Sequence, residues 1–255
     1  MPTVRAPDPA SGVFETLLVL DGSPVELDAH LERISHSTGE LFGSDLPPGT
    51  RELVHEHARP LPLGRLRLTA TPAPGGELSA GVVTAAVGRA DVFPSWDRAI
   101  ELRRFLFPGG VGAHKWADRA TLAALESELP EGCLPLLLDD GGVVLEASRA
   151  NLFAVEGDVL ITPPADGRIL PGVARSRAIE AARSLGIEVR EQELTLERLL
   201  AASEAFLTGS VRGVEPVRAV EDARLDRPGD GAREIAATMK RHWIGRGAAS
   251  WAAAL

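Results

Sequence analysis

Tyrosine is absent from this 255-residue chain, and cysteine is nearly so. The absence of tyrosine removes one side chain that enzymes use as a general acid. Cys133 is the single cysteine, which excludes an internal disulfide framework and a cysteine-rich metal site. The six histidines are scattered without the spacing of a metal-binding motif, so we expect no metal centre. Lysine is scarce too, because only Lys115 and Lys240 occur among 27 lysine and arginine residues.

Excess positive charge and long apolar runs are also missing. The net charge is −9 and no basic cluster is present, which argues against nucleic-acid binding. No apolar run approaches the roughly 20 residues that cross a bilayer, and the polar, proline-rich start does not resemble a signal peptide. We therefore expect a cytoplasmic protein without a membrane or nucleic-acid partner. The composition, 44% hydrophobic and 25% charged, is that of a globular protein.

Strands and helices are predicted in two halves. The first half has a predicted strand at 13–20, a helix from the N-cap Asp28 to the stop at Gly43, a helix at 50–58, and strands at 65–71, 80–87 and 99–106. A glycine-rich stretch at 108–113 then indicates a linker. We therefore predict a mixed α/β fold with an N-terminal domain at 1–107 and a C-terminal domain at 114–255.

The first predicted helix carries a polar stripe beside its apolar face. His30, Arg33 and Ser37 are three or four residues apart, so their side chains can face one place. Arg33 could bind an anion, and a surface salt bridge is the alternative. For His30 we favour a structural role over a catalytic one.

The stretch 146–175 combines an acidic residue with an anion-binding feature. Glu146 ends an apolar strand, and a hairpin at 151–162 follows. A Leu-Pro-Gly step then opens a helix whose first N–H groups, at Val173 and Ala174, could bind an anion. Ser210 follows a later strand and could add a hydroxyl. Taken alone, Glu146 is also consistent with an ordinary strand-end carboxylate.

Lys115 is the candidate reactive group. It follows the glycine-rich stretch and precedes Trp116. A lysine that is shielded from solvent can have a lowered amine pKa, which makes it a nucleophile towards an aldehyde. A solvated surface lysine is the alternative, and Lys240, on a charged helix, fits that description.

Together these motifs resemble class IV aminotransferases, the fold-type IV enzymes that use pyridoxal 5'-phosphate (PLP). The resemblance covers roughly residues 12 to 220 and is carried by GVFETL (12–17), HLERISHS (30–37), Lys115, EASRANLFAVEGDVLITP (146–163), ILPGVARSRAIEAARSLGIEVRE (169–191) and FLTGSVRGVEPV (206–217). It implies a smaller N-terminal α/β domain, a larger C-terminal pseudo-barrel domain, PLP between them, and a homodimer.

The resemblance also implies roles for individual residues. Lys115 would bond to the aldehyde of PLP, and Glu146 would pair with the ring nitrogen. The phosphate would be held by Arg33, by the backbone at Val173 and Ala174, and by Ser210.

Within the family, the resemblance is greatest to 4-amino-4-deoxychorismate lyases. Lys115 to Arg119 (KWADR) resembles their Lys-x-x-Asn-Arg pattern, with Asp118 in place of asparagine. Phe14 stands where D-amino-acid enzymes carry tyrosine, and the Gly-Gly-Asn-Tyr stretch of branched-chain enzymes is missing. We therefore expect a small-molecule amine substrate and elimination of pyruvate to give 4-aminobenzoate, a step of folate biosynthesis. The alternatives are a class IV aminotransferase acting on a branched-chain or D-amino acid, and a non-catalytic family member with a shortened N-terminus.

Overall fold

The structure is a computed structural model that describes residues 5–225 and 229–245. These residues form two compact units. The small unit consists of Ala6–Val92, His114–Arg119 and residues 241–245. The large unit consists of Phe93–Ala113 and Ala120–Lys240, together with Arg5.

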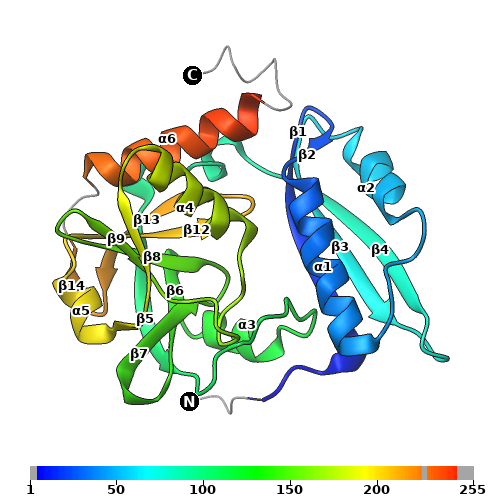
Figure 1. The fold of residues 1–255 in the computed structure, drawn as a ribbon, viewed down its shortest axis with the longest axis horizontal. Coiled ribbons are helices and arrows are strands. Elements are labelled where there is room, and N and C mark those ends of the chain that lie inside the picture. The colour runs from blue at the N-terminus through cyan, green and yellow to red at the C-terminus, as the bar shows by residue number, and fades with distance from the viewer. Residues whose placement is uncertain (1–4, 226–228, 246–255) are drawn as a thin grey trace. The chain divides into compact units, whose positions relative to one another are not determined.

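The small unit is a four-stranded antiparallel sheet with two helices (Figure 1). The sheet order is β2-β1-β3-β4, and β1 and β3 pair along the whole length of β1. The elements are β1 (Val13–Leu20), β2 (Ser23–Pro24), α1 (Leu27–Phe42), α2 (Thr50–Ala58), β3 (Leu63–Pro72) and β4 (Leu78–Ala86).

The core of the small unit lies between its helices and one face of its sheet. Leu17 and Val19 of β1 are fully buried there, with Ile34 of α1 and Val54 of α2. These β1 residues are two apart and so share a face. Glu15 shares that face as well, which directs its side chain towards α1.

Helix α1 follows its sequence pattern closely. Ile34 and Thr38 are buried, and Leu31 and Leu41 pack against the same core, so the predicted apolar stripe is confirmed. Gly43 ends the helix in the left-handed conformation, with φ 63°, as predicted. Asp28 is not the N-cap: the helix begins at Leu27, whose side chain is drawn into the core, and Glu26 caps it without a side-chain hydrogen bond.

The large unit is built on a ten-stranded sheet. Its main order is β10-β9-β8-β12-β13-β5-β6-β7-β11, with β14 paired to β13. The pairs β9–β10, β5–β13 and β5–β6 are parallel. The strands are β5 (Ile100–Leu106), β6 (Cys133–Leu138), β7 (Val143–Ala147), β8 (Asn151–Glu156), β9 (Val159–Thr162), β10 (Glu188–Glu191), β11 (Leu194–Thr195), β12 (Glu204–Gly209), β13 (Gly213–Val220) and β14 (Ala223–Arg224). The helices are α3 (Ala120–Ser127), α4 (Val173–Ser184), α5 (Leu196–Ala201) and the start of α6 (Asp230–Gly245).

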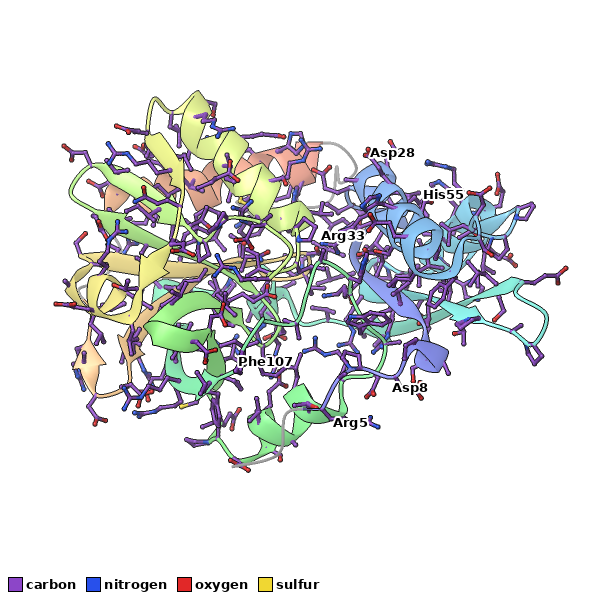
Figure 2. All side chains as sticks on the ribbon, turned by 60° about the horizontal axis from the view of Figure 1, so that its bottom comes forward. Arg5, Asp8, Asp28, Arg33, His55 and Phe107 are labelled. Atoms are coloured by element: carbon purple, nitrogen blue, oxygen red, sulfur yellow. The ribbon has the colours of Figure 1, made fainter. Side chains whose placement is uncertain are left out.

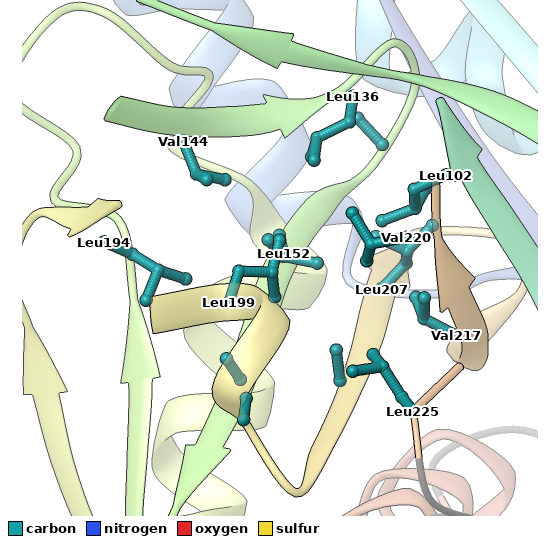
Figure 3. Packing of buried hydrophobic residues seen from close by; sticks show 14 of the residues in the cluster. Leu102, Leu136, Val144, Leu152, Leu194, Leu199, Leu207, Val217, Val220 and Leu225 are labelled. Carbon is teal, nitrogen blue, oxygen red and sulfur yellow. The ribbon is translucent and has the colours of Figure 1, made fainter. Parts of the chain in front are cut away.

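The core of the large unit is aliphatic. Leucines and valines from strands across the sheet meet the α5 side chain of Leu199 (Figure 3). Leu136, Leu152 and Leu207, from three different strands, are fully buried in this cluster. A closely packed aliphatic core of this kind gives β7, β8 and β12 fixed positions, and these strands carry or precede Glu146, Asn151 and Ser210.

The glycine-rich stretch is not the boundary between the two units. The predicted strand at 99–106 is β5, and it pairs with β6 and β13 inside the large unit. The segment from His114 to Arg119 belongs to the small unit, where Trp116 forms a bridge to Val13. Because of this long-range strand pairing, the two units are not separated by a single linker at 108–113. Within the described residues, no helix is long and apolar enough to cross a membrane.

Candidate active site

The small unit holds Lys115 against β1 through backbone hydrogen bonds. The Phe14 N–H donates to the Lys115 carbonyl at 2.8 Å, and the Ala117 N–H donates to the Gly12 carbonyl at 2.9 Å. On this edge β2 pairs only with Val19 and Leu20, which leaves the first half of β1 to the lysine segment. The backbone of Lys115 is therefore held as firmly as a short strand, and its side chain is half-buried.

Two cationic side chains lie over the ring of Phe14. The Lys115 Nζ is 4.9 Å from the ring centroid, and the Arg67 Cζ is 3.7 Å from it. Burial, and then the charge of Arg65, lower the pKa of Arg67 from its ordinary value. Among the described residues Arg67 has no carboxylate partner. Arg67 was not predicted from the sequence. Thr16 pairs with Arg67 across β1 and β3, and this pairing places the arginine on the face of Phe14.

A buried carboxylate lies on the opposite face of β1. Glu15 is 1% exposed and accepts hydrogen bonds from the Arg33 Nε at 2.7 Å and the Arg33 Nη2 at 2.6 Å. The His30 Nδ1 lies 2.7 Å from the same carboxylate. Burial alone would raise the pKa of Glu15, but the charge of Arg33 and the contact with His30 outweigh it and hold this pKa at about 2.

Two of the three side chains of the polar stripe on α1 meet at one residue, as predicted, and the third contacts another. His30 and Arg33 both reach Glu15 (Figure 2 labels Arg33 on α1), and Ser37 contacts the His114 Nδ1 at 3.1 Å. Burial lowers the pKa of His30; Glu15 opposes this shift, and the charges of Arg33 and Lys115 add to it. The pair formed by Arg33 is buried, so the surface salt bridge considered for it is not what the structure shows.

The large unit contains the second predicted carboxylate. Glu146, in β7, is 4% exposed. Its Oε2 accepts from the Asn151 Nδ2 at 3.0 Å, and its Oε1 accepts from the Leu170 N–H at 3.1 Å. Asn151 also donates to the Leu170 carbonyl at 2.9 Å, which ties the start of β8 to the chain before α4. The predicted hairpin at 151–162 is confirmed as β8 and β9.

Unpaired hydrogen-bonding groups gather at the start of α4 and the end of β12. The helix begins at Val173, as predicted, and Gly172 caps it without a side-chain hydrogen bond. The N–H groups of Val173 and Ala174 have no partner among the described residues. The Thr208 hydroxyl, on β12, is buried and has no partner there either. Helix α4 packs against β12, which leads directly to Ser210. Donors of this kind suit an anion.

Two other kinds of site were considered in the described residues. No group of three histidine, cysteine or acidic side chains among them could hold a metal ion. A cavity of about 740 Å³ in the large unit is lined by Trp96, Glu101, Arg218, Arg224 and Arg233, among others, and by none of the predicted site residues.

Comparison with known proteins identifies the family. The model for amino-transferase class IV matches residues 12–220. The chain belongs to this family. It is therefore a mixed α/β chain of the fold-type IV class, and the members of this class are PLP-dependent enzymes.

Two curated relatives of the class IV chain carry aminotransferase names. The branched-chain-amino-acid aminotransferase of Escherichia coli K12 is 44% identical over 90 residues, which is 35% of this chain and 29% of that enzyme. The match thus spans less than a third of that relative's length. A protein of Methanocaldococcus jannaschii, provisionally named a branched-chain-amino-acid aminotransferase, is 30% identical over 229 residues, 81% of this chain and 77% of that protein.

Two solved structures share the fold of the class IV chain. The 4-amino-4-deoxychorismate lyase of Pseudomonas aeruginosa is 24% identical, with a TM-score of 0.78 over 91% of each chain. The PLP-bound form of a hypothetical aminotransferase from Mycobacterium tuberculosis is also 24% identical, with a TM-score of 0.81 over 96% of this chain and 95% of that one.

PLP is the cofactor of the family, and the residues of this class IV chain fit it. The small unit contains the amine of Lys115 and the guanidinium of Arg33. The large unit, described by itself, contains the buried carboxylate of Glu146, the N–H groups at the start of α4 and the Ser210 hydroxyl. These groups match an aldehyde, a protonated ring nitrogen and a phosphate in number and in charge.

Proposed function

We propose that this chain is a PLP-dependent 4-amino-4-deoxychorismate lyase that releases pyruvate and 4-aminobenzoate. The observation that carries the proposal is the arrangement around Phe14. An amine at Lys115 and a guanidinium without a carboxylate partner at Arg67 lie over one apolar ring. A six-membered substrate ring that carries an amine and a carboxylate fits this combination, because the ring can pack on Phe14 while Arg67 binds the carboxylate.

Each residue would contact the part of PLP that matches its chemistry. Lys115 would bond to the aldehyde of PLP, and Glu146 would pair with the ring nitrogen. Arg33, the N–H groups of Val173 and Ala174, and the Ser210 hydroxyl would hold the phosphate. When bound, PLP supplies an electron sink for the carbon that bears the substrate nitrogen.

The proton transfer is assigned to Lys115. With the substrate amine in its place, the Lys115 Nζ would accept the proton from the carbon that bears nitrogen. In the lyase reaction, the C–O bond to the enolpyruvyl group would then break, that group would take up the proton from the Nζ and leave as pyruvate, and the ring would become aromatic. The neutral Nζ would then be able to bond to the cofactor again. Glu146 would keep the ring nitrogen protonated throughout.

A class IV aminotransferase acting on a branched-chain or D-amino acid is the second candidate. The names of the E. coli and M. jannaschii relatives favour it. The roles of Glu146 and Arg33 would be unchanged. The difference lies in Lys115, whose Nζ would return the proton to the cofactor carbon instead of allowing pyruvate to leave.

The products distinguish these candidates. The purified protein loaded with PLP is incubated with aminodeoxychorismate, and pyruvate and 4-aminobenzoate are measured without any keto acid. Formation of both supports the lyase. Turnover that requires an amino-acid and keto-acid pair would instead establish the aminotransferase.

The scarcity of lysine gives a direct test of the covalent bond. Borohydride reduction of the loaded protein should attach the cofactor to Lys115, and peptide mass spectrometry can assign it because Lys240 is the only other lysine. Lys115→Ala should abolish the modification and the visible absorbance band, whereas Lys240→Ala should keep both. An unmodified wild-type protein without turnover would support the non-catalytic alternative. We also infer a homodimer, as the family resemblance implies, which light scattering can check.

A further inference from the structure

The buried Glu15 carboxylate of the small unit has no role in the function proposed so far. Three hydrogen bonds of 2.6–2.7 Å converge on the Glu15 carboxylate, two from Arg33 and one from His30. Arg33 is held side-on, with its Nε and Nη2 bonded to separate oxygens. This two-pronged geometry fixes the plane of the guanidinium as well as its position.

Stability alone is a poor explanation for this cluster. Burying an ion pair costs about as much desolvation free energy as the attraction returns, so apolar residues of similar size often serve equally well. Glu15 lies on the core face of β1, two residues before the fully buried Leu17. An apolar side chain would fit the alternation of the strand there. The presence of a carboxylate at this position therefore indicates that Arg33 requires a charged partner.

The pairing leaves the far edge of the guanidinium directed away from Glu15. A guanidinium has five N–H bonds in one plane, and the Glu15 carboxylate receives one from Nε and one from Nη2. The Nη1 bonds and the second Nη2 bond point to the other side. His30 restrains the same carboxylate at Oε2, so the acceptor itself cannot turn freely.

We propose that Glu15 is a positioning residue: it holds Arg33 in the orientation that receives the cofactor phosphate. The inference rests on the proposed function of Arg33. Glu15 itself touches neither the cofactor nor the substrate in this scheme. Its contribution is to remove the rotamer freedom that a long arginine side chain would otherwise lose on binding.

The test compares PLP with pyridoxal, which lacks the phosphate. Apparent dissociation constants of both are measured by absorbance titration of wild type, Glu15→Gln, Arg33→Gln and the double variant. Glu15→Gln should weaken PLP binding about 10- to 100-fold, the size found when a group that orients a ligand is removed. Pyridoxal binding should change less than about twofold, since it does not use Arg33. The double variant should bind PLP no more weakly than Arg33→Gln alone, because the two residues act as one unit.

Glu156→Gln is the matched control. Glu156 accepts from the Nε and Nη2 of Arg198 at 3.0 and 2.9 Å, the same fork in the large unit, and neither residue is among those proposed to bind PLP. It should leave the ratio of PLP to pyridoxal affinity unchanged. Glu15→Asp keeps the charge with a shorter reach and should lie between wild type and Glu15→Gln, which also covers the case in which Glu15→Gln does not fold.

The possible failures are separable. Wild type that binds neither compound, or that does not prefer PLP, would overturn the proposed function. Wild type that prefers PLP, with Glu15 variants that keep the same preference, would overturn the positioning role alone. An equal loss of PLP and pyridoxal binding would do the same, since it would indicate a general structural effect.

Discussion

At the scale of single residues, the two buried carboxylates of the candidate site are held in different ways. Glu15 is bonded to the charged guanidinium of Arg33, so its charge is compensated inside the small unit. Glu146 accepts from the neutral amide of Asn151 and the backbone N–H of Leu170. These two donors fix the orientation of the Glu146 carboxylate. Glu146 is the carboxylate that we propose to pair with the ring nitrogen of PLP, and Glu15 is the one to which we assign a supporting role.

Replacement of Glu146 tests the first of these roles. Glu146→Gln should keep the covalent bond at Lys115 but lower kcat by roughly 10²-fold or more, the scale of a lost preorganised charge. The new amide also places an NH₂ group against a donor N–H, so we expect a stability loss of about 1–3 kcal/mol. Absorbance, steady-state kinetics and urea unfolding measure the three quantities. Unchanged kcat with the cofactor bound would contradict the pairing with the ring nitrogen.

Replacement of Glu15 should change how the stability of the protein depends on pH. The pKa of Glu15 is about 2 in the folded protein, below its ordinary value of 4.5. Its contribution is therefore complete above about pH 4.5 and is lost as the pH falls towards 2. Glu15→Gln should destabilise the protein by about 3 kcal/mol at pH 7, and this gap should narrow between pH 4.5 and 3 in urea unfolding.

Glu215 gives the control of opposite sign. Burial raises the pKa of Glu215 despite its contact with Arg212, so folding favours its protonated form. Relative to wild type, Glu215→Gln should therefore become less favourable as the pH falls. A wild-type advantage over Glu15→Gln that stays constant with pH would show that the Glu15 charge does not matter.

At the scale of elements, the start of α4 depends on a glycine for close packing. A Cβ atom on Gly172 would lie 2.0 Å from the Asn151 Oδ1. Asn151 cannot move without releasing Glu146 and the Leu170 carbonyl. Gly172→Ala should therefore cost about 1–3 kcal/mol of stability, as overpacking does, and should weaken PLP binding too. Thermal unfolding and absorbance titration measure both effects.

Gly39 provides the comparison within a helix. It lies inside α1, and an added Cβ would meet nothing within 4 Å. Gly39→Ala should stabilise the protein by about 0.5–1 kcal/mol, since alanine loses less backbone entropy on folding. If the two alanine variants gave the same change in melting temperature, close packing at Gly172 would not be the cause of the change in Gly172→Ala.

The elements also show what could be predicted from the sequence. Local signals were sufficient for α2, for the β8–β9 hairpin and for α4, because capping, turn residues and periodicity act over a few neighbours. The assignment of β5 to the large unit depends on pairing with β13, more than 100 residues later, which no local pattern reports. Arg67 and Glu15 were missed for a similar reason. Arg67 matters because it lies on the same face of the sheet as Phe14, and Glu15 matters because it lies on the face directed towards α1. Both placements are set by strand register.

At the scale of the whole molecule, the residues proposed to bind PLP come from both units. Lys115 and Arg33 belong to the small unit, and Glu146, Ala174 and Ser210 to the large one. A ligand that binds only the folded protein stabilises it by about 2.7 kcal/mol at a concentration of 100 times its Kd. Removal of PLP with hydroxylamine should therefore lower the melting midpoint by roughly 5–10 °C for a chain of this size, and added PLP should restore it.

Hydrogen exchange can locate this stabilisation. Adding PLP to the apoprotein should slow amide exchange at Phe14 and Ala117 in the small unit, and at Val173 and Ala174 in the large unit. Strand β4 of the small unit and helix α5 of the large unit carry none of the proposed ligands, so they serve as internal controls with smaller changes. Protection confined to one unit would contradict a cofactor held by residues from both, even if the melting midpoint rose.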